Sequence, residues 1–85
     1  MYNQRYRLTK LESNKRTQMH EEIEGNICYL AYFNVGEVGW FLCDTRAMFN
    51  PVHRIRTSIV NNVLYADNQI IVVTENSKYT FELER

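Results

Sequence analysis

The chain has 85 residues, enough for one domain with a modest hydrophobic core and too few for two independent domains. Hydrophobic residues make up 45% of it and aromatic residues 13%, a composition that excludes intrinsic disorder. Ten Lys and Arg balance ten Asp and Glu. The resulting net charge of zero argues against a protein that gathers nucleic acid or anionic lipid through its overall field.

The first residues are polar, and no apolar segment follows them that would serve as a secretory signal. No apolar run approaches the ~20 residues that a membrane helix needs. The sequence therefore predicts a cytoplasmic protein without a membrane contact. The only cysteines, Cys28 and Cys43, lack the C-x-x-C spacing of a zinc site, and we expect free, buried thiols.

The amino-terminal third predicts one strand and one ambiguous segment. Apolar and polar residues alternate over residues 5–11, which is typical of a strand with one buried face. Residues 17–24 alternate in the same way and are interpreted as a second strand. A short helix near 15–24 is the alternative, because Met19 and Ile23 lie four residues apart and polar residues precede them that could cap a helix.

The middle of the chain predicts a hairpin. Residues 27–35 are apolar on both faces, as in a central strand, and Gly36-Glu37 is a signal for a two-residue turn. In the pairing that this turn sets, Cys43 on the return strand lies opposite Leu30. Cys28 is then only a diagonal neighbour of Cys43, which is a poor geometry for a disulfide.

The last third predicts a β-meander, because its final residues alternate strictly between polar and apolar. A two-residue turn at Asn76-Ser77 places Val72 opposite Phe81, and a second turn at Asp67-Asn68 adds Tyr65 and Val63 to the same apolar face. A slip of one residue would turn all these side chains to the other face. We therefore expect Val63, Val72 and Phe81 in one core layer.

A strand over residues 52–60 completes the set, with Arg54 and Arg56 on one face and Ile55 and Thr57 on the other. Six or seven short strands joined by tight turns predict a single, mostly β domain over residues 1–85. Its expected form is a small antiparallel meander that curls into a barrel or a half-open roll. The open edge of such a roll would also allow a homodimer.

No set of residues predicts catalysis, and we expect a protein that is not an enzyme. His53 and Ser58 lie five residues apart, which puts them on opposite faces of a strand. His20 with Glu22 and Glu24 offers one imidazole and two carboxylates, too few strong ligands for a metal site. Neither a metal nor a cofactor is expected.

Arginines predict a surface for binding anions. Arg54 and Arg56 share a face by their spacing, as do Arg5 and Arg7. If the two strands were neighbours, the four guanidinium groups would form one patch suited to phosphates or to the carboxylates of a partner. The simpler alternative is that these arginines are the solvated outer face of two strands.

Two aromatic residues are candidates for stacking or anchoring at this patch. Trp40 lies on the return strand of the central hairpin, although a core position is the simpler interpretation for it. Phe49 lies in the irregular segment 44–51, which could fold as a flap over the open end of the core.

Two stretches of the last third carry a pattern shared with other proteins. The first runs from Arg54 to Val63 through Ile55, Arg56, Thr57, Ser58 and Val60, and the second contains Val73, Thr74, Asn76, Ser77, Tyr79 and Phe81. This pattern resembles the carboxy-terminal part of short uncharacterised mostly β proteins of bacterial phages and mobile elements. The resemblance implies roles such as inhibiting host defence enzymes, sequestering nucleotide signals or accessory regulation, and it carries no site residues.

The sequence thus favours a non-catalytic binding protein that acts through a surface contact with a protein or a small phosphorylated ligand, such as an accessory or anti-defence protein of a phage or mobile element. Direct nucleic-acid binding on the same patch, as in other small β-barrels, is the first alternative, which the zero net charge disfavours. A structural subunit of an assembly is the second alternative.

Overall fold

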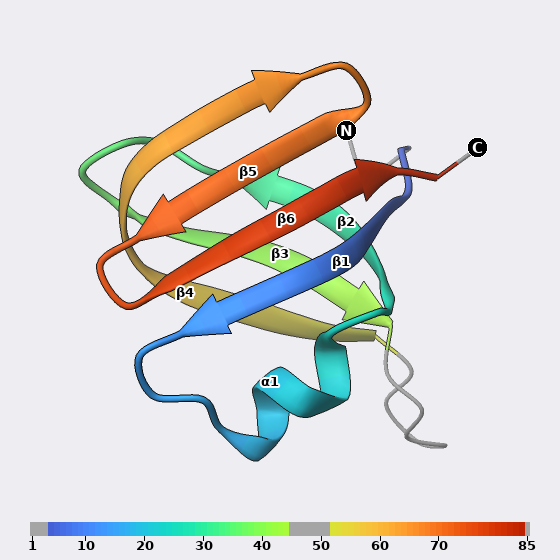
Figure 1. Cartoon of the computed structure of the whole chain (residues 1–85), viewed down its shortest axis with the longest axis horizontal. Coiled ribbons are helices and arrows are strands. Elements are labelled where there is room, and N and C mark those ends of the chain that lie inside the picture. Colours follow the sequence, from blue (N-terminus) through green and yellow to red (C-terminus); the bar gives the residue numbers. More distant parts are fainter. Residues whose placement is uncertain (1–3, 45–51, 85) are drawn as a thin grey trace.

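The computed structural model describes residues 4–44 and 52–84, with the side chains of Val52 and His53 excepted. Within these residues the chain forms six strands and one short helix (Figure 1). In chain order they are β1 (Tyr6–Ser13), α1 (Gln18–Ile23), β2 (Ile27–Tyr32), β3 (Val38–Asp44), β4 (Val52–Ala66), β5 (Gln69–Thr74) and β6 (Ser77–Leu83).

The six strands close into an antiparallel barrel in which each strand pairs with the next and β6 pairs with β1. The prediction of a mostly β meander is confirmed, and of its two forms the barrel is the observed one. Strand β4 is long enough to serve both sides of the barrel, and its pairing with β5 shifts between Val60 and Asn62, the kind of irregularity that lets a strand bend. None of the six described strands is terminal in this closed order, so the open-edge argument for a homodimer no longer applies to them.

The barrel interior is filled by aromatic and aliphatic side chains from every strand. Phe41 lies at its centre, with its ring centroid 5.2 Å from that of Phe81 and 5.7 Å from that of Tyr79, both in edge-to-face contact. Val72 and Phe81 are fully buried, and Val63 packs against this cluster. The predicted core layer is confirmed for Val63, Val72 and Phe81, whereas the prediction that Tyr65 lies on the same apolar face is wrong, because its side chain is exposed beside the β4–β5 turn.

The carboxy-terminal hairpin has the predicted faces but a different register. Val72 lies opposite Tyr79 and not opposite Phe81, a shift of two residues that preserves which side chains point inward. The shift arises because Thr74 holds the turn: its hydroxyl accepts a hydrogen bond from the Ser77 backbone N–H at 3.0 Å and donates to the Ser77 carbonyl at 3.1 Å. The turn at Asp67-Asn68 is as predicted.

The central hairpin also departs from its predicted register. Strand β2 ends at Tyr32, and Phe33 leaves the strand to pack against the core. Gly39 makes this possible, because a Cβ atom at that position would lie 2.6 Å from the Phe33 ring. Along the rest of the hairpin Cys28 consequently faces Cys43 directly, where the sequence predicted only a diagonal relation.

The segment 17–24 forms the helix α1, so its interpretation as a strand is wrong and the helical alternative is correct. Thr17 caps the helix by accepting a hydrogen bond from the His20 backbone N–H, and the His20 ring accepts one from the Thr17 N–H at 3.0 Å. His20 and Ile23 are both buried. The N-cap and the burial of these two side chains favour the helix. The alternating pattern favours a strand only weakly, because it contains few apolar residues.

Beyond the last pair that β1 forms with β2, residues on either side of α1 form hydrogen bonds with the backbone of β1. The Glu24 carboxylate accepts a hydrogen bond from the Leu11 N–H at 2.7 Å, and the Arg16 guanidinium donates to the Leu11 carbonyl and to Glu24. These side chains bind the Leu11 N–H and carbonyl in place of a neighbouring strand. Such partners matter because a backbone polar group without a hydrogen bond is costly away from water. The helix is thereby anchored across one end of the barrel (Figure 1).

Burial of His20 makes the fold sensitive to pH. Loss of solvent, with the nearby charge of Arg16, lowers the pKa of His20 below its ordinary value of 6.5. The unfolded chain therefore binds a proton at a higher pH than the folded chain, so the free energy of unfolding falls as the pH drops from 6.5 through the folded pKa. The urea midpoint is expected to be lower at about pH 5.5 than at about pH 7.5.

His20→Gln is the matched control for this pH dependence, since Gln at the same position can also accept the Thr17 N–H but does not titrate. The variant is expected to lose most of the difference between the two urea midpoints. An unchanged difference would assign the pH dependence to other groups.

Candidate binding face on strands β2 to β4

Alternation along β3 and along residues 54–57 of β4 divides their side chains between the core and the outer surface. Phe41 and Ile55 are buried, whereas Arg54 and Arg56 are exposed and Trp40 is half-buried. Together with their neighbours on β2 and β3 these outward residues form the arginine–aromatic face: Tyr29, Tyr32, Trp40, Leu42, Arg54 and Arg56.

The register orders this face into two rows that cross the three strands. Tyr32, Trp40 and Arg56 form one row. The second row consists of Tyr29, Leu42 and Arg54. Each row thus begins with a tyrosine, passes through a large apolar or aromatic side chain and ends in an arginine.

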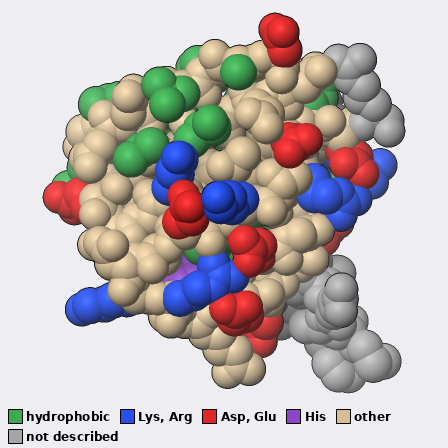
Figure 2. Space-filling view, in the orientation of Figure 1, with side chains coloured by type: hydrophobic (Ala, Val, Ile, Leu, Met, Phe, Trp, Pro, Cys, Tyr) green, Lys and Arg blue, Asp and Glu red, His purple; other side chains and the backbone are tan. Residues whose placement is uncertain are grey.

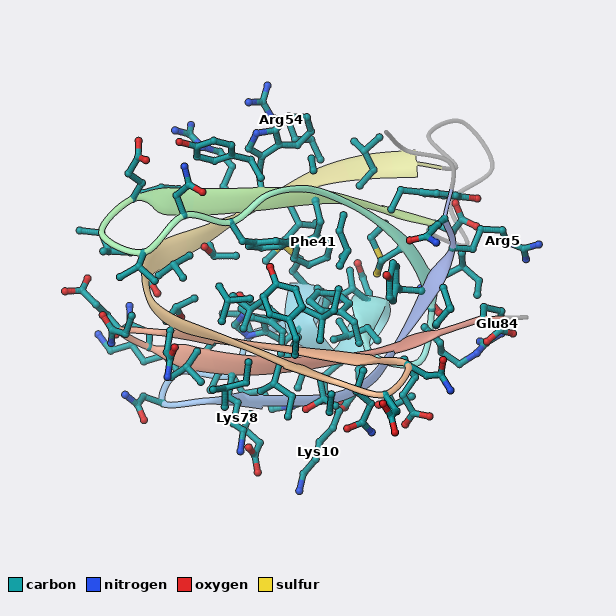
Figure 3. All side chains as sticks on the ribbon, turned by 90° about the horizontal axis from the view of Figure 1, so that it is seen from above. Arg5, Lys10, Phe41, Arg54, Lys78 and Glu84 are labelled. Atoms are coloured by element: carbon teal, nitrogen blue, oxygen red, sulfur yellow. The ribbon has the colours of Figure 1, made fainter. Side chains whose placement is uncertain are left out.

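Arg54 connects the two rows. Its guanidinium carbon lies 4.4 Å from the centroid of the Trp40 ring, a cation–π contact that holds both side chains in place. The basic residues in ion pairs between described residues are Arg7, Lys10 and Arg16. Neither Arg54 nor Arg56 forms an ion pair with a described carboxylate. Figure 3 shows Arg54 projecting outward from the barrel, on the opposite side from Lys10 and Lys78. Among the described residues, no carboxylate therefore competes with an anionic ligand for the Arg54 guanidinium.

Tyr32 is oriented by the hairpin that follows it. Its hydroxyl donates to the Glu37 carboxylate at 2.7 Å and accepts from the Asn34 side-chain amide at 2.9 Å. The hydrogen bond to Glu37 raises the pKa of Tyr32 above its ordinary value, so the phenol stays neutral. The ring is therefore held in a defined position at the edge of the face.

Arg5 and Arg7 lie elsewhere, because β1 pairs with β2 and β6 and not with β4. The condition for one four-arginine patch is therefore not met. The Arg7 guanidinium contacts the Glu84 carboxylate at 2.8 and 3.3 Å and donates to the Gly25 carbonyl at 2.8 Å. The hydrogen bonds from Arg7 to Glu84 lower the pKa of Glu84, and each of the three side-chain nitrogens of Arg7 has a partner. Figure 3 shows Arg5 beside Glu84, apart from Arg54.

The remaining candidates of the sequence do not extend this face. Phe49 and the flap predicted around it lie outside the described residues, as does the His53 side chain. The Ser58 hydroxyl donates to that of Thr74 at 2.8 Å and accepts from the Asn76 N–H at 3.2 Å, which gives it a structural role between β4 and β5. Among the described residues no three His, Cys, Asp or Glu side chains gather as metal ligands would.

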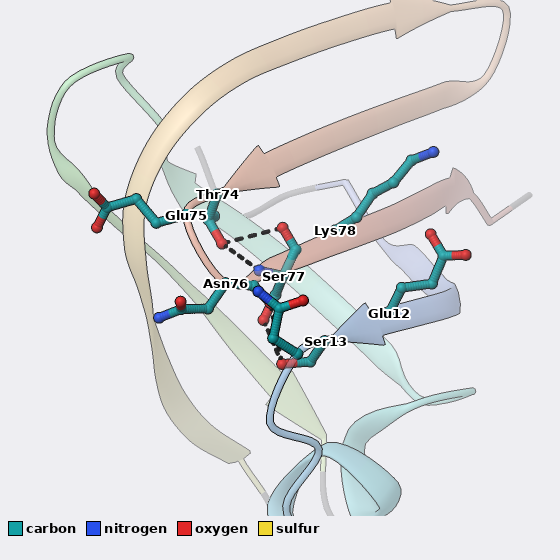
Figure 4. A pocket seen from close by; sticks show the side chains of 8 residues that line it. Glu12, Ser13, Thr74, Glu75, Asn76, Ser77 and Lys78 are labelled. Carbon is teal, nitrogen blue, oxygen red and sulfur yellow. Dashed lines mark hydrogen bonds between the residues drawn. The ribbon is translucent and has the colours of Figure 1, made fainter.

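A shallow pocket of about 300 Å³ lies at the β5–β6 turn, away from the arginine–aromatic face (Figure 4). Its hydroxyls bind one another or the turn: Ser77 donates to Ser13 at 2.9 Å, and Thr74 holds the backbone of Ser77. These groups serve the fold. Sequence reasoning missed the pocket, although Ser and Asn cluster at both 13–14 and 76–77.

Apolar side chains also reach the surface at the β4–β5 hairpin. Leu64 and Tyr65 are exposed there, and Figure 2 shows apolar atoms gathered over this upper part of the molecule. Charged side chains are concentrated lower on the same view, over β1, β6 and the region of α1. The polar and apolar parts of this side are thus separated.

These features define a small closed β-barrel with an arginine–aromatic outer face. Comparisons with protein-family models, with curated proteins and with solved structures found no match for the chain. Within the described residues, no helix has the length and apolar character needed to cross a lipid bilayer.

Proposed function

We propose that this protein is a non-catalytic binding protein that contacts an anionic partner, a protein or a phosphorylated ligand, through the arginine–aromatic face. The observation that carries the proposal is the pair of exposed arginines, Arg54 and Arg56, which lack a carboxylate partner among the described residues and lie beside Trp40. Guanidinium groups in this setting bind phosphates and carboxylates through paired hydrogen bonds.

The shape of the face favours an extended partner over an enclosed small molecule. Its two rows lie across the outside of three barrel strands, whereas the pocket of about 300 Å³ is formed by β1 and the β5–β6 turn. A ligand on this face would therefore lie across the surface. Arg5 remains exposed at the other end of β1, but Arg7 is already engaged by Glu84, so the proposal rests on Arg54 and Arg56.

Single-stranded nucleic acid is the second candidate ligand, favoured by the aromatic members of the rows. Proteins that bind single strands without sequence preference combine basic groups with aromatic rings on which bases stack. Tyr32, which is 39% exposed, and Trp40 offer two such rings next to Arg56. Affinity for an oligothymidylate should then fall steeply between ~50 and ~200 mM salt, whereas a protein contact should change little.

Trp40 provides the test, because it is the only tryptophan of the chain and lies within the face. Its fluorescence is expected to change when the protein is titrated with tripolyphosphate or with an oligothymidylate. Arg54→Glu combined with Arg56→Glu is expected to weaken binding at least about ten-fold, since hydrogen bonds to charged groups contribute roughly 1.5–3 kcal/mol each. Binding unchanged by this pair of substitutions would exclude the face as the site.

Lys10→Glu combined with Lys78→Glu is the matched control, because it reverses the same number of charges on the opposite side of the barrel (Figure 3). This variant is expected to bind like the unaltered protein. Equal losses in the two double variants would mean that only overall charge matters, which would contradict a defined site.

We also propose that this binding takes place in the cytoplasm. The resemblance to proteins of phages and mobile elements suggests an accessory or anti-defence role, in which a surface contact without catalysis would be enough.

A further inference from the structure

Two cysteine side chains meet in the barrel interior. Cys28 on β2 and Cys43 on β3 are direct cross-strand partners, with their Sγ atoms 3.3 Å apart, and both are free and fully buried. A reduced pair at this distance is in contact. No feature of the binding face uses either thiol.

The backbone already suits a disulfide between these residues. Directly opposed residues of an antiparallel pair have Cα atoms about 4.5 or 5.5 Å apart, and both values lie within the range of about 4.4–6.8 Å found in disulfides. Forming an S–S bond of about 2.05 Å requires the two sulfur atoms to approach by little more than 1 Å. Rotation of the side chains and a small approach of β2 and β3 supply this movement.

Helix α1 covers the end of the barrel at which the pair lies (Figure 1). The carbonyl of Ile23, the last residue of α1, lies 3.9 Å from the Cys43 sulfur. Asn26, just after the helix, donates to the carbonyls of Glu22 at 2.7 Å and of Asp44 at 2.8 Å, which ties the helix to the end of β3. A helix of six residues is unstable by itself and depends on such contacts.

We propose that Cys28 and Cys43 are a modification site at which a small-molecule disulfide such as oxidised glutathione forms an intramolecular disulfide, and that local opening of α1 admits this oxidant. One cysteine loses its proton and its sulfur attacks the small disulfide, which releases one thiol and leaves a mixed disulfide. The second cysteine then attacks the protein sulfur of that mixed disulfide and releases the second thiol. The cysteine pair is oxidised by two electrons and the small disulfide is reduced to two thiols.

The closed barrel protects the pair. The hydrogen bond to Cys43 and burial raise the pKa of the Cys28 thiol far above its ordinary value, so a reactive thiolate forms only after opening. Short helices held by few contacts open more readily than the rest of a domain. The oxidation rate should therefore report on the stability of α1.

The first experiment incubates the folded full chain with oxidised glutathione and measures its mass. The expected product has lost two hydrogen atoms and carries no glutathione, and its Tm is raised by roughly 15 °C because the bond closes a loop of about 15 residues. Cys43→Ala should show neither change. A product that keeps glutathione, or that is a disulfide-linked dimer, would overturn the proposal.

The second experiment weakens the N-cap of α1 to test whether opening of this helix admits the oxidant to the cysteine pair. Thr17→Ala removes the cap and is expected to speed oxidation about five-fold, whereas Thr17→Ser keeps the hydroxyl and should oxidise at the original rate. Asn68→Ala destabilises the distant β4–β5 turn, where φ is 61°, and serves as the control for global unfolding. Thr17→Ala oxidising no faster than Asn68→Ala would contradict the proposed opening.

Discussion

Phe81→Ala is expected to lower the free energy of unfolding by about 3–5 kcal/mol. Phe81 is fully buried, and its ring lies 5.2 Å from Phe41, 6.1 Å from Phe33 and 6.2 Å from Tyr79. Removing the ring leaves a cavity in the middle of this aromatic cluster, next to Phe41, which Figure 3 labels in the barrel interior. Small domains have a total stability of roughly 5–15 kcal/mol, so the variant should lose a large part of it.

Tyr65→Ala is the matched control, because it removes an aromatic ring that is 75% exposed. Its effect is expected to stay within about 0.5 kcal/mol. Urea unfolding followed by far-UV circular dichroism measures both variants. Similar losses for the two substitutions, or a loss below about 1 kcal/mol for Phe81→Ala, would show that the cluster is not the centre of the core.

The faces of the strands were predictable because alternation is a local property. Val72 and Phe81 could be assigned to the core from the residues next to them, and the structure confirms both. The pairing across the β4–β5 turn was also predictable, but the pairing partners across the β5–β6 turn were not, because side-chain contacts select the residues of that turn. Thr74 fixes the last turn through Ser77 and Ser58, and neither contact follows from a turn propensity.

The other differences between the predicted and the observed site arise from pairing between strands that are far apart in the sequence. Arg54 and Arg56 share a face because they lie two residues apart on one strand, and this part of the candidate site was predictable. Whether β1 lies beside β4 depends on how the barrel closes. The separation of Arg5 from Arg54 and Arg56 was therefore not predictable. The contact of Trp40 with Arg54 likewise arises from the pairing of β3 with β4.

The helix α1 shows how a capping signal can be overlooked. Thr17 is a good N-cap residue, but the group that completes the capping box is His20, where Glu or Gln is usual. A search for the usual pattern therefore fails. The register that brings Cys28 opposite Cys43 was not predictable from the turn residues either. It depends on a contact between side chain and backbone, in which Phe33 leaves β2 and lies over Gly39.

Gly39→Ala is expected to lower the free energy of unfolding by about 2–3 kcal/mol, because it overpacks a closed part of the core. The added Cβ atom would lie 2.6 Å from one ring carbon of Phe33 and 3.0 Å from the Tyr32 carbonyl oxygen. The ring cannot move aside freely, since it packs within 6.2 Å of Phe41 and 6.1 Å of Phe81. The backbone oxygen belongs to the end of β2 and cannot move without disturbing the strand.

A double-mutant cycle with Phe33→Leu separates this clash from other effects of the substitution. Leucine lacks the ring atoms that meet the new Cβ, so Gly39→Ala is expected to cost at least about 1 kcal/mol less in the Phe33→Leu background. Gly36→Ala controls for strain of the backbone alone, because φ is 91° there and no atom lies within 4 Å of an added Cβ. If the Phe33→Leu background left the cost of Gly39→Ala unchanged, the packing of the Phe33 ring on Gly39 would not be what sets the register of β2 and β3.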